Sequence, residues 1–266
     1  MIGNALVRRY ALSALRPRYL WLNIGMYVIG LALIGLLNAL ALKSGTAYNG
    51  STRLCLRSIY GQLLALQFLL LWVWGGYNTG NALREEILHK SYDFFQLLPL
   101  RPWQKLFGLV VGRNLLALAL AGITAIAQLA LGLASRVPLF LQLQLAFALG
   151  VTTALIWCVL TLSSIRPFQG KSRQNEVWAL MLIFPAFVVV PMVIQVVQMV
   201  ASGNALADWR ISFFSLNFPG VLLVGIITSY FVSWAALGTM RRLLRSDVIL
   251  FSPSGAYRFL AGCLVI

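Results

Sequence analysis

Long apolar segments dominate the pattern of this chain. Six stretches contain no Asp, Glu, Lys or Arg and reach the length of about 20 residues that an α-helix needs to cross a bilayer. These stretches are 19–42, 58–83, 114–135, 137–165, 177–207 and 211–240. Their apolar residues run continuously instead of alternating with polar ones, which argues against the strands of a membrane β-barrel. The pattern predicts an all-α membrane protein with six transmembrane helices in a single domain, 1–266.

Two shorter segments combine charged and apolar residues at helical spacing. The N-terminal segment 1–18 contains NALVRRYALSALR, which predicts a short interfacial helix. The segment 84–98 predicts an amphipathic helix that ends at Pro99. Its apolar side consists of Ile87, Leu88, Tyr92, Phe94, Phe95 and Leu98. Its polar side consists of Glu85, Glu86, His89, Asp93 and Gln96.

Helix-breaking residues interrupt the last two long stretches. Pro185 and Pro191 lie inside the fifth stretch, and Pro219 with Gly220 opens the sixth. Proline removes a backbone donor, and a membrane tolerates such breaks where protein or a cavity surrounds them. Two interpretations remain open: a kinked spanning helix, or short or re-entrant helices over about 192–219 near an outer gate. The C-terminal tail, 247–266, is too short in its apolar part to span and is expected to lie in the interface or to begin a further helix.

Charge sets the expected orientation of the chain. Only 10% of the residues are charged, yet the net charge is +15. Arg and Lys are concentrated at both ends of the chain and in the loops after the second and fourth stretches. Together these regions contain about three times as many bases as the other connections do. The positive-inside rule then places both termini in the cytoplasm of a multi-pass protein in the cell membrane. Since the bases flank apolar runs, anionic lipid headgroups explain them better than nucleic acid does.

Residues for chemistry of its own are missing from the sequence. A single histidine, His89, excludes a multi-histidine metal site, and the three cysteines share no motif spacing. Gly170-Lys171-Ser172 is similar to the end of a phosphate-binding loop, but Ile165 stands where that motif needs glycine. The predicted spans also lack the acids and histidines that ion-coupled transporters carry at mid-membrane. We therefore expect no enzyme activity, metal or cofactor in this chain.

One block of sequence carries a family resemblance. Residues 84–108, REEILHKSYDFFQLLPLRPWQKLFG, resemble the cytoplasmic segment of ABC-2 type permeases, the membrane subunits of type V ATP-driven exporters. That family has an acidic residue, a short helix ending in Leu-Leu-x-Pro-Leu/Ile-Ser-Pro, and an apolar run with glycine. Residues 97–102 and Gly108 match this pattern, whereas Arg101 replaces the usual serine and Lys90-Ser91 replaces a common Gly-Thr.

The resemblance implies a function and a set of partners. It implies a dimer of permeases, with itself or with a homologue, above two ATPase subunits that bind Mg-ATP. The segment 84–98 would be the coupling helix, and the substrate would be amphipathic or lipid-like. The resemblance implies that the acids contact the ATPase and that the apolar residues attach the coupling helix to the bundle. The acids are Glu85, Glu86 and Asp93, and the attachment residues are Ile87, Phe94, Phe95 and Leu98. Pro99 ends the coupling segment. A secondary transporter or channel and a non-transporting assembly subunit remain as alternatives.

Overall fold

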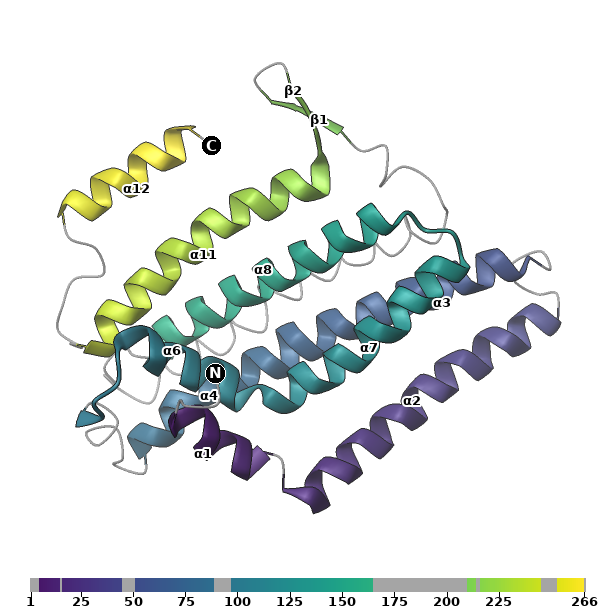
Figure 1. Ribbon diagram of the computed structural model, residues 1–266, viewed down its shortest axis with the longest axis horizontal. Helices are drawn as coiled ribbons and strands as arrows, with labels where there is room; N and C mark the ends of the chain where they lie inside the picture. Colours follow the sequence, from purple (N-terminus) through teal and green to yellow (C-terminus); the bar gives the residue numbers. More distant parts are fainter. Residues whose placement is uncertain are drawn as a thin grey trace, which may run out of the picture.

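The computed structural model shows a predominantly helical protein whose long helices lie side by side (Figure 1). It describes residues 5–14, 16–44, 51–88, 97–164, 210–213, 216–244 and 253–265. The helices are α1 (Ala5–Ala14), α2 (Pro17–Lys43), α3 (Thr52–Phe68), the π-helix η2 (Leu69–Trp74), α4 (Gly75–Leu88), α6 (Pro102–Arg113), α7 (Leu115–Ala134), α8 (Leu139–Ser164), α11 (Gly220–Leu244) and α12 (Pro253–Val265). The strands are β1 (Arg210–Phe213) and β2 (Leu216–Pro219).

Five helical segments in the described part of the chain are long and apolar enough to cross a membrane. They are Leu20–Lys43, Thr52–Ala82, Leu115–Ala134, Leu139–Ser164 and Gly220–Arg241. Each corresponds to one of the six predicted spans. The remaining prediction, 177–207 with Pro185 and Pro191, lies outside the described residues. Apolar helices of this length identify the chain as a membrane protein.

The sixth stretch is helical over only part of 211–240. The helix begins at Gly220, where Pro219 and Gly220 were expected to open it, whereas the residues before it do not form the expected helix. Before it, β1 and β2 form an antiparallel hairpin in which Arg210 pairs with Pro219 and Phe213 with Leu216. Pro219 explains the boundary, because a proline disfavours helical backbone at the residue before it. The apolar residues of the hairpin suit a strand as well as a helix.

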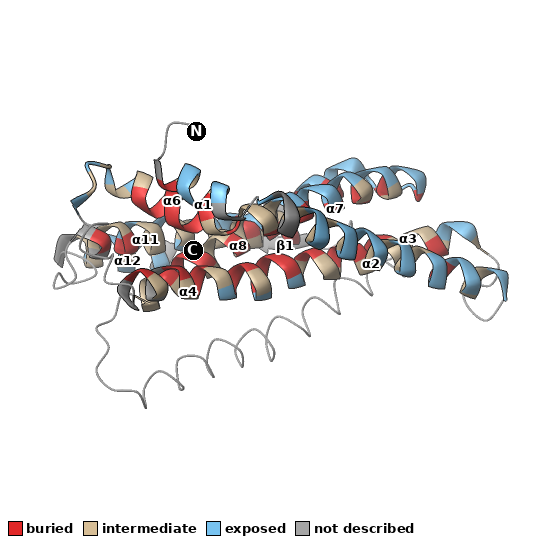
Figure 2. Cartoon of the chain, turned by 90° about the horizontal axis from the view of Figure 1, so that it is seen from below, coloured by how far each residue is buried: buried red, intermediate tan, exposed pale blue. Residues whose placement is uncertain are grey.

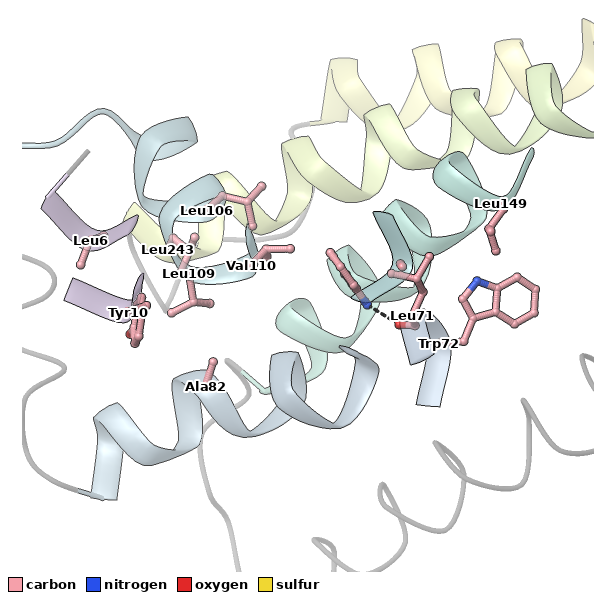
Figure 3. Close-up of a cluster of buried hydrophobic side chains, with 12 residues drawn as sticks. Leu6, Tyr10, Leu71, Trp72, Ala82, Leu106, Leu109, Val110, Leu149 and Leu243 are labelled. Carbon is pink, nitrogen blue, oxygen red and sulfur yellow. Dashed lines mark hydrogen bonds between the residues drawn. The ribbon is translucent and has the colours of Figure 1, made fainter. Parts of the chain in front are cut away.

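Buried side chains gather where α1, η2, α4, α6, α7, α8 and α11 meet (Figures 2 and 3). A pair of tryptophans ties η2 to α8 in this core. The Trp157 indole Nε1 donates a hydrogen bond of 2.9 Å to the carbonyl of Leu71, and Trp72 Nε1 donates one of 3.1 Å to Thr153 Oγ1. Gly75 permits the approach, since a Cβ there would lie 2.7 Å from the Trp157 ring. Polar indole groups are thus satisfied inside an apolar core.

Helix α2 lies at the margin of the bundle and exposes most of its apolar surface (Figures 1 and 2). Trp21, Met26 and Leu37 are each more than half exposed. Polar contacts fix α2 to its neighbour: Asn38 Nδ2 donates to Gln62 Oε1 of α3 at 2.8 Å. An exposed apolar helix is stable where lipid, rather than water, covers it. The exposure of α2 therefore agrees with a membrane environment.

Candidate functional site: an ion-pair junction of helices α1, α4 and α6

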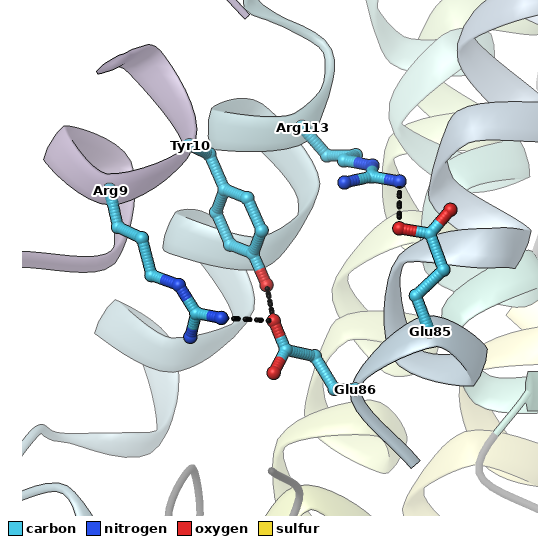
Figure 4. A network of polar contacts seen from close by, with 5 residues as sticks. All are labelled: Arg9, Tyr10, Glu85, Glu86 and Arg113. Atoms are coloured by element: carbon cyan, nitrogen blue, oxygen red, sulfur yellow. Dashed lines mark hydrogen bonds and ion pairs between the residues drawn. The ribbon is translucent and has the colours of Figure 1, made fainter. Parts of the chain in front are cut away.

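Two adjacent acids at the end of α4 form the centre of the junction. Glu85 and Glu86 follow each other in a helix, so their side chains point in directions about 100° apart. Glu86 meets Arg9 and Tyr10 of α1, and Glu85 meets Arg113 at the end of α6 (Figure 4). One turn of α4 therefore binds two other helices that are distant in sequence. We define this set of five residues as the junction.

The Glu86 carboxylate is buried, and two donors from α1 satisfy it. The residue is only 6% exposed. The Tyr10 hydroxyl donates to its Oε1 at 2.8 Å, and Arg9 Nη2 lies 3.3 Å from the same oxygen. Burial, followed by the hydrogen bond to Glu86, raises the pKa of Tyr10 well above its usual range. Because a buried carboxylate without donors is strongly unfavourable, Glu86 stabilises the docked position of α1.

The second ion pair joins α4 to α6 at a more open position. Arg113 Nη2 contacts Glu85 Oε2, and both side chains are partly exposed. Arg113 is the last residue of α6, where a base also interacts favourably with the helix dipole. The next residue, Asn114, is fully buried and donates through Nδ2 to Thr79 Oγ1 of α4 at 2.6 Å. Charged and neutral contacts thus both fix α4 beside the α6–α7 boundary.

Apolar packing beneath the junction holds α1 directly against α6 (Figure 3). Leu6 and Tyr10, one turn apart on α1, are 2% and 5% exposed. A Cβ at Gly112 of α6 would lie 3.0 Å from Tyr10 Cδ2 and 3.4 Å from Val7 Cα. Only glycine allows this approach without displacing α1. The predicted N-terminal helix is therefore present over 5–14, with its apolar face on protein.

Lys105 is an unexpected buried base in the same region. It lies on α6 and is 3% exposed, whereas lysine side chains are seldom this deeply buried. Burial lowers the pKa of its ammonium group. A long lysine stem packs well among apolar side chains, which explains how α6 accommodates it.

The structure brings together only some of the predicted site residues. Glu85 and Glu86 both belong to the junction, each with its own basic partner. Leu98 packs on the main apolar core, whereas Pro99 is exposed. Pro219 and Gly220 form the boundary between β2 and α11. Asp93, Phe94, Phe95, Pro185 and Pro191 lie outside the described residues.

Sequence reasoning missed Arg9, Tyr10 and Arg113 as partners of these acids. One signal was available: the chain has six acids against 21 bases, so each acid has many possible partners. The identity of the partner depends on how α1 and α6 pack, which the residue pattern leaves open.

The described residues offer no group of three or more His, Cys, Asp or Glu that could hold a metal ion. The junction consists of two ion pairs and the hydrogen bond of a tyrosine, and these contacts attach α1, α4 and α6 to one another. Comparisons of the chain with protein-family models, curated proteins and solved structures found no match.

Proposed function

We propose that this chain is the membrane-spanning permease subunit of an ATP-driven exporter of the ABC-2 type. It would act as a dimer of permeases, with both termini in the cytoplasm and with separate ATPase subunits that hold Mg-ATP. The resemblance of residues 84–108 to the cytoplasmic segment of that family is the basis of the proposal. The junction supplies the physical reason why that segment would transmit force.

The observation that best supports the proposal is the continuity of helix from a span into the expected coupling segment. The helical path runs from Thr52 through η2 to Leu88, so the first residues of 84–98 extend a spanning helix. The acids of this extension bind α1 and α6 at the same level. A displacement of the segment by an ATPase would therefore move α1, α4 and α6 together.

The internal contacts of the two glutamates change the roles that we propose for individual residues. Glu86 is too deeply buried to present its carboxylate to a partner, and Glu85 is engaged by Arg113. We assign both to positioning of the coupling segment. Asp93 then remains as the acid for ATPase contact, while Phe94 and Phe95 attach the segment to the bundle.

The substrate proposal follows from the composition of the described spans, which contain no acid and carry bases only near their ends. Five described spans contain buried amides and hydroxyls such as Gln67, Thr124 and Gln144, with long apolar surfaces between them. Binding a charged solute in such surroundings is unfavourable. An amphipathic or lipid-like substrate that passes between two permease copies suits these surfaces better.

Replacement of two phenylalanines tests the proposal. The Phe94→Ala/Phe95→Ala variant should lose its ATPase subunits on purification in mild detergent, or ATP hydrolysis should lose its response to transported substrate. Phe140→Ala is the matched control, because Phe140 is 62% exposed at the start of α8, far from the coupling segment. Transport by the double variant at the rate of the wild type would refute the assignment.

A further inference from the structure

Helix α1 ends close to the start of a helix that can span the membrane. It ends at Ala14, α2 begins at Pro17, and the spanning part of α2 begins at Leu20. An extended link to Pro17 and one turn of helix cover about 15 Å at most. The last turn of α1 therefore stays within about 15 Å of the start of that span. A lipid headgroup beside the start of the span is close enough to contact the outer surface of this turn.

The two faces of α1 differ in what they contact. Leu6 and Tyr10 face the protein, as described above. On the opposite side, about 200° further round the helix, lie Arg8 and Leu12, and Leu12 is 68% exposed. Arg16, which is also exposed, is two residues beyond the end of α1 and precedes the first residue of α2. We use the name outer face of α1 for Arg8 and Leu12 together with Arg16 in the link that follows.

The charges of the described residues leave this face without an acidic partner. Both described acids are engaged, Glu86 by Arg9 and Glu85 by Arg113. Arg8 and Arg16 form no ion pair within the described part of the chain. Since arginine donates to phosphate oxygens in a planar fork, an anionic phosphate group complements this face in both charge and geometry.

We propose that the outer face of α1 binds an anionic phospholipid of the adjoining leaflet. Arg8 and Arg16 donate to the phosphate of its headgroup, and Leu12 contacts the upper part of its acyl chains. Arg9 stays with Glu86, so lipid binding leaves the junction intact. The inference rests on the proposed function only in placing this leaflet on the cytoplasmic side.

Native mass spectrometry of the detergent-solubilised full chain tests the lipid site directly. Phosphatidylglycerol is titrated as the anionic probe, with phosphatidylcholine as the zwitterionic comparison. The Arg8→Gln/Arg16→Gln variant should bind the first phosphatidylglycerol about 25-fold more weakly than the wild type does. Each arginine near an anionic surface contributes about fivefold to the affinity, and the variant loses two. Arg8→Lys/Arg16→Lys keeps the charge but not the planar fork and should bind with an affinity between those of the wild type and the glutamine variant, which separates loss of charge from loss of fold. Arg53→Gln/Arg136→Gln, at exposed positions at the other end of the bundle, should bind as the wild type does.

The outcomes separate this inference from the exporter proposal. Equal affinity of the wild type for the two lipids, or an unchanged affinity in Arg8→Gln/Arg16→Gln, would overturn the lipid site. The lipid site would also be overturned if Arg8→Gln/Arg16→Gln kept its lipid affinity but lost an ATPase subunit, because the outer face of α1 would then bind protein instead of lipid. Since the titration needs no ATPase, selective lipid binding supports the site even if the chain is not an exporter.

Discussion

The hydrogen bond between Tyr10 and Glu86 gives the sharpest prediction about the junction. Tyr10→Phe removes the hydroxyl that donates to Glu86 at 2.8 Å and preserves the ring that packs on Gly112. The ion pair of Glu86 with Arg9 remains, but the Arg9 side chain is 54% exposed, so solvent screens most of that attraction. A hydrogen bond to a charged group contributes about 1.5–3 kcal/mol. We therefore expect Tyr10→Phe to lower the free energy of opening of α1 by about 2 kcal/mol.

Hydrogen exchange in lipid nanodiscs measures this loss locally. Opening of α1 should increase about 30-fold for a change of about 2 kcal/mol, seen as faster exchange in a peptide that covers residues 5–14. Glu86→Ala should have a similar effect, and the double variant should cost less than the sum of the two, because the two changes remove the same bond. Tyr60→Phe is the control, since Tyr60 is equally buried but belongs to a separate apolar cluster on α3. Unchanged exchange of residues 5–14 in Tyr10→Phe would refute the role of this bond.

Three further predictions concern packing and titration. Gly112→Ala should also speed exchange in α1, because its Cβ would press on Tyr10, whereas Gly122→Ala should not, since its Cβ would meet nothing within 4 Å; equal effects would contradict the close packing. Trp157→Phe deletes the bond to the Leu71 carbonyl and should lower the thermal midpoint by several degrees, a loss of about 1–3 kcal/mol; an unchanged midpoint would argue against the bond. Finally, the raised pKa of Tyr10 means that its stabilising contribution is complete below its ordinary value of 10.0 and is lost as pH rises through the folded-state pKa. The thermal midpoint of the wild type should therefore fall more steeply above pH 10 than that of Tyr10→Phe, and parallel curves would contradict this.

Much of the helical architecture was predictable because a bilayer imposes one strong rule. A spanning helix must avoid charge over its whole length, so charge-free stretches locate it closely. The stretch 114–135 became α7 over Leu115–Ala134, and 137–165 became α8 over Leu139–Ser164. The same rule failed at the β1–β2 hairpin. Absence of charge marks an apolar segment but does not distinguish helix from strand, and Ile and Phe suit both.

The junction was only half predictable from the sequence. Helical spacing separates the two glutamates from the predicted apolar side of their segment. It treats every polar face as a surface for water or a partner, although here that face meets Arg9 and Tyr10 of the same chain. Tertiary packing of α1 on α6 decides the difference, and Gly112 is the residue that permits it. A single sequence contains these residues but gives no distance between them.

The side of the membrane on which residues 84–98 lie tests the exporter account most directly. Ser91→Cys can be introduced together with Cys263→Ser, because Cys263 is the exposed cysteine while Cys55 and Cys158 are buried. A membrane-impermeant maleimide then reports the location of residue 91 in sealed vesicles of known orientation. The account predicts labelling in inside-out vesicles and protection in right-side-out ones. Labelling from the external side would place the segment beyond the reach of any cytoplasmic ATPase and would contradict the proposed coupling.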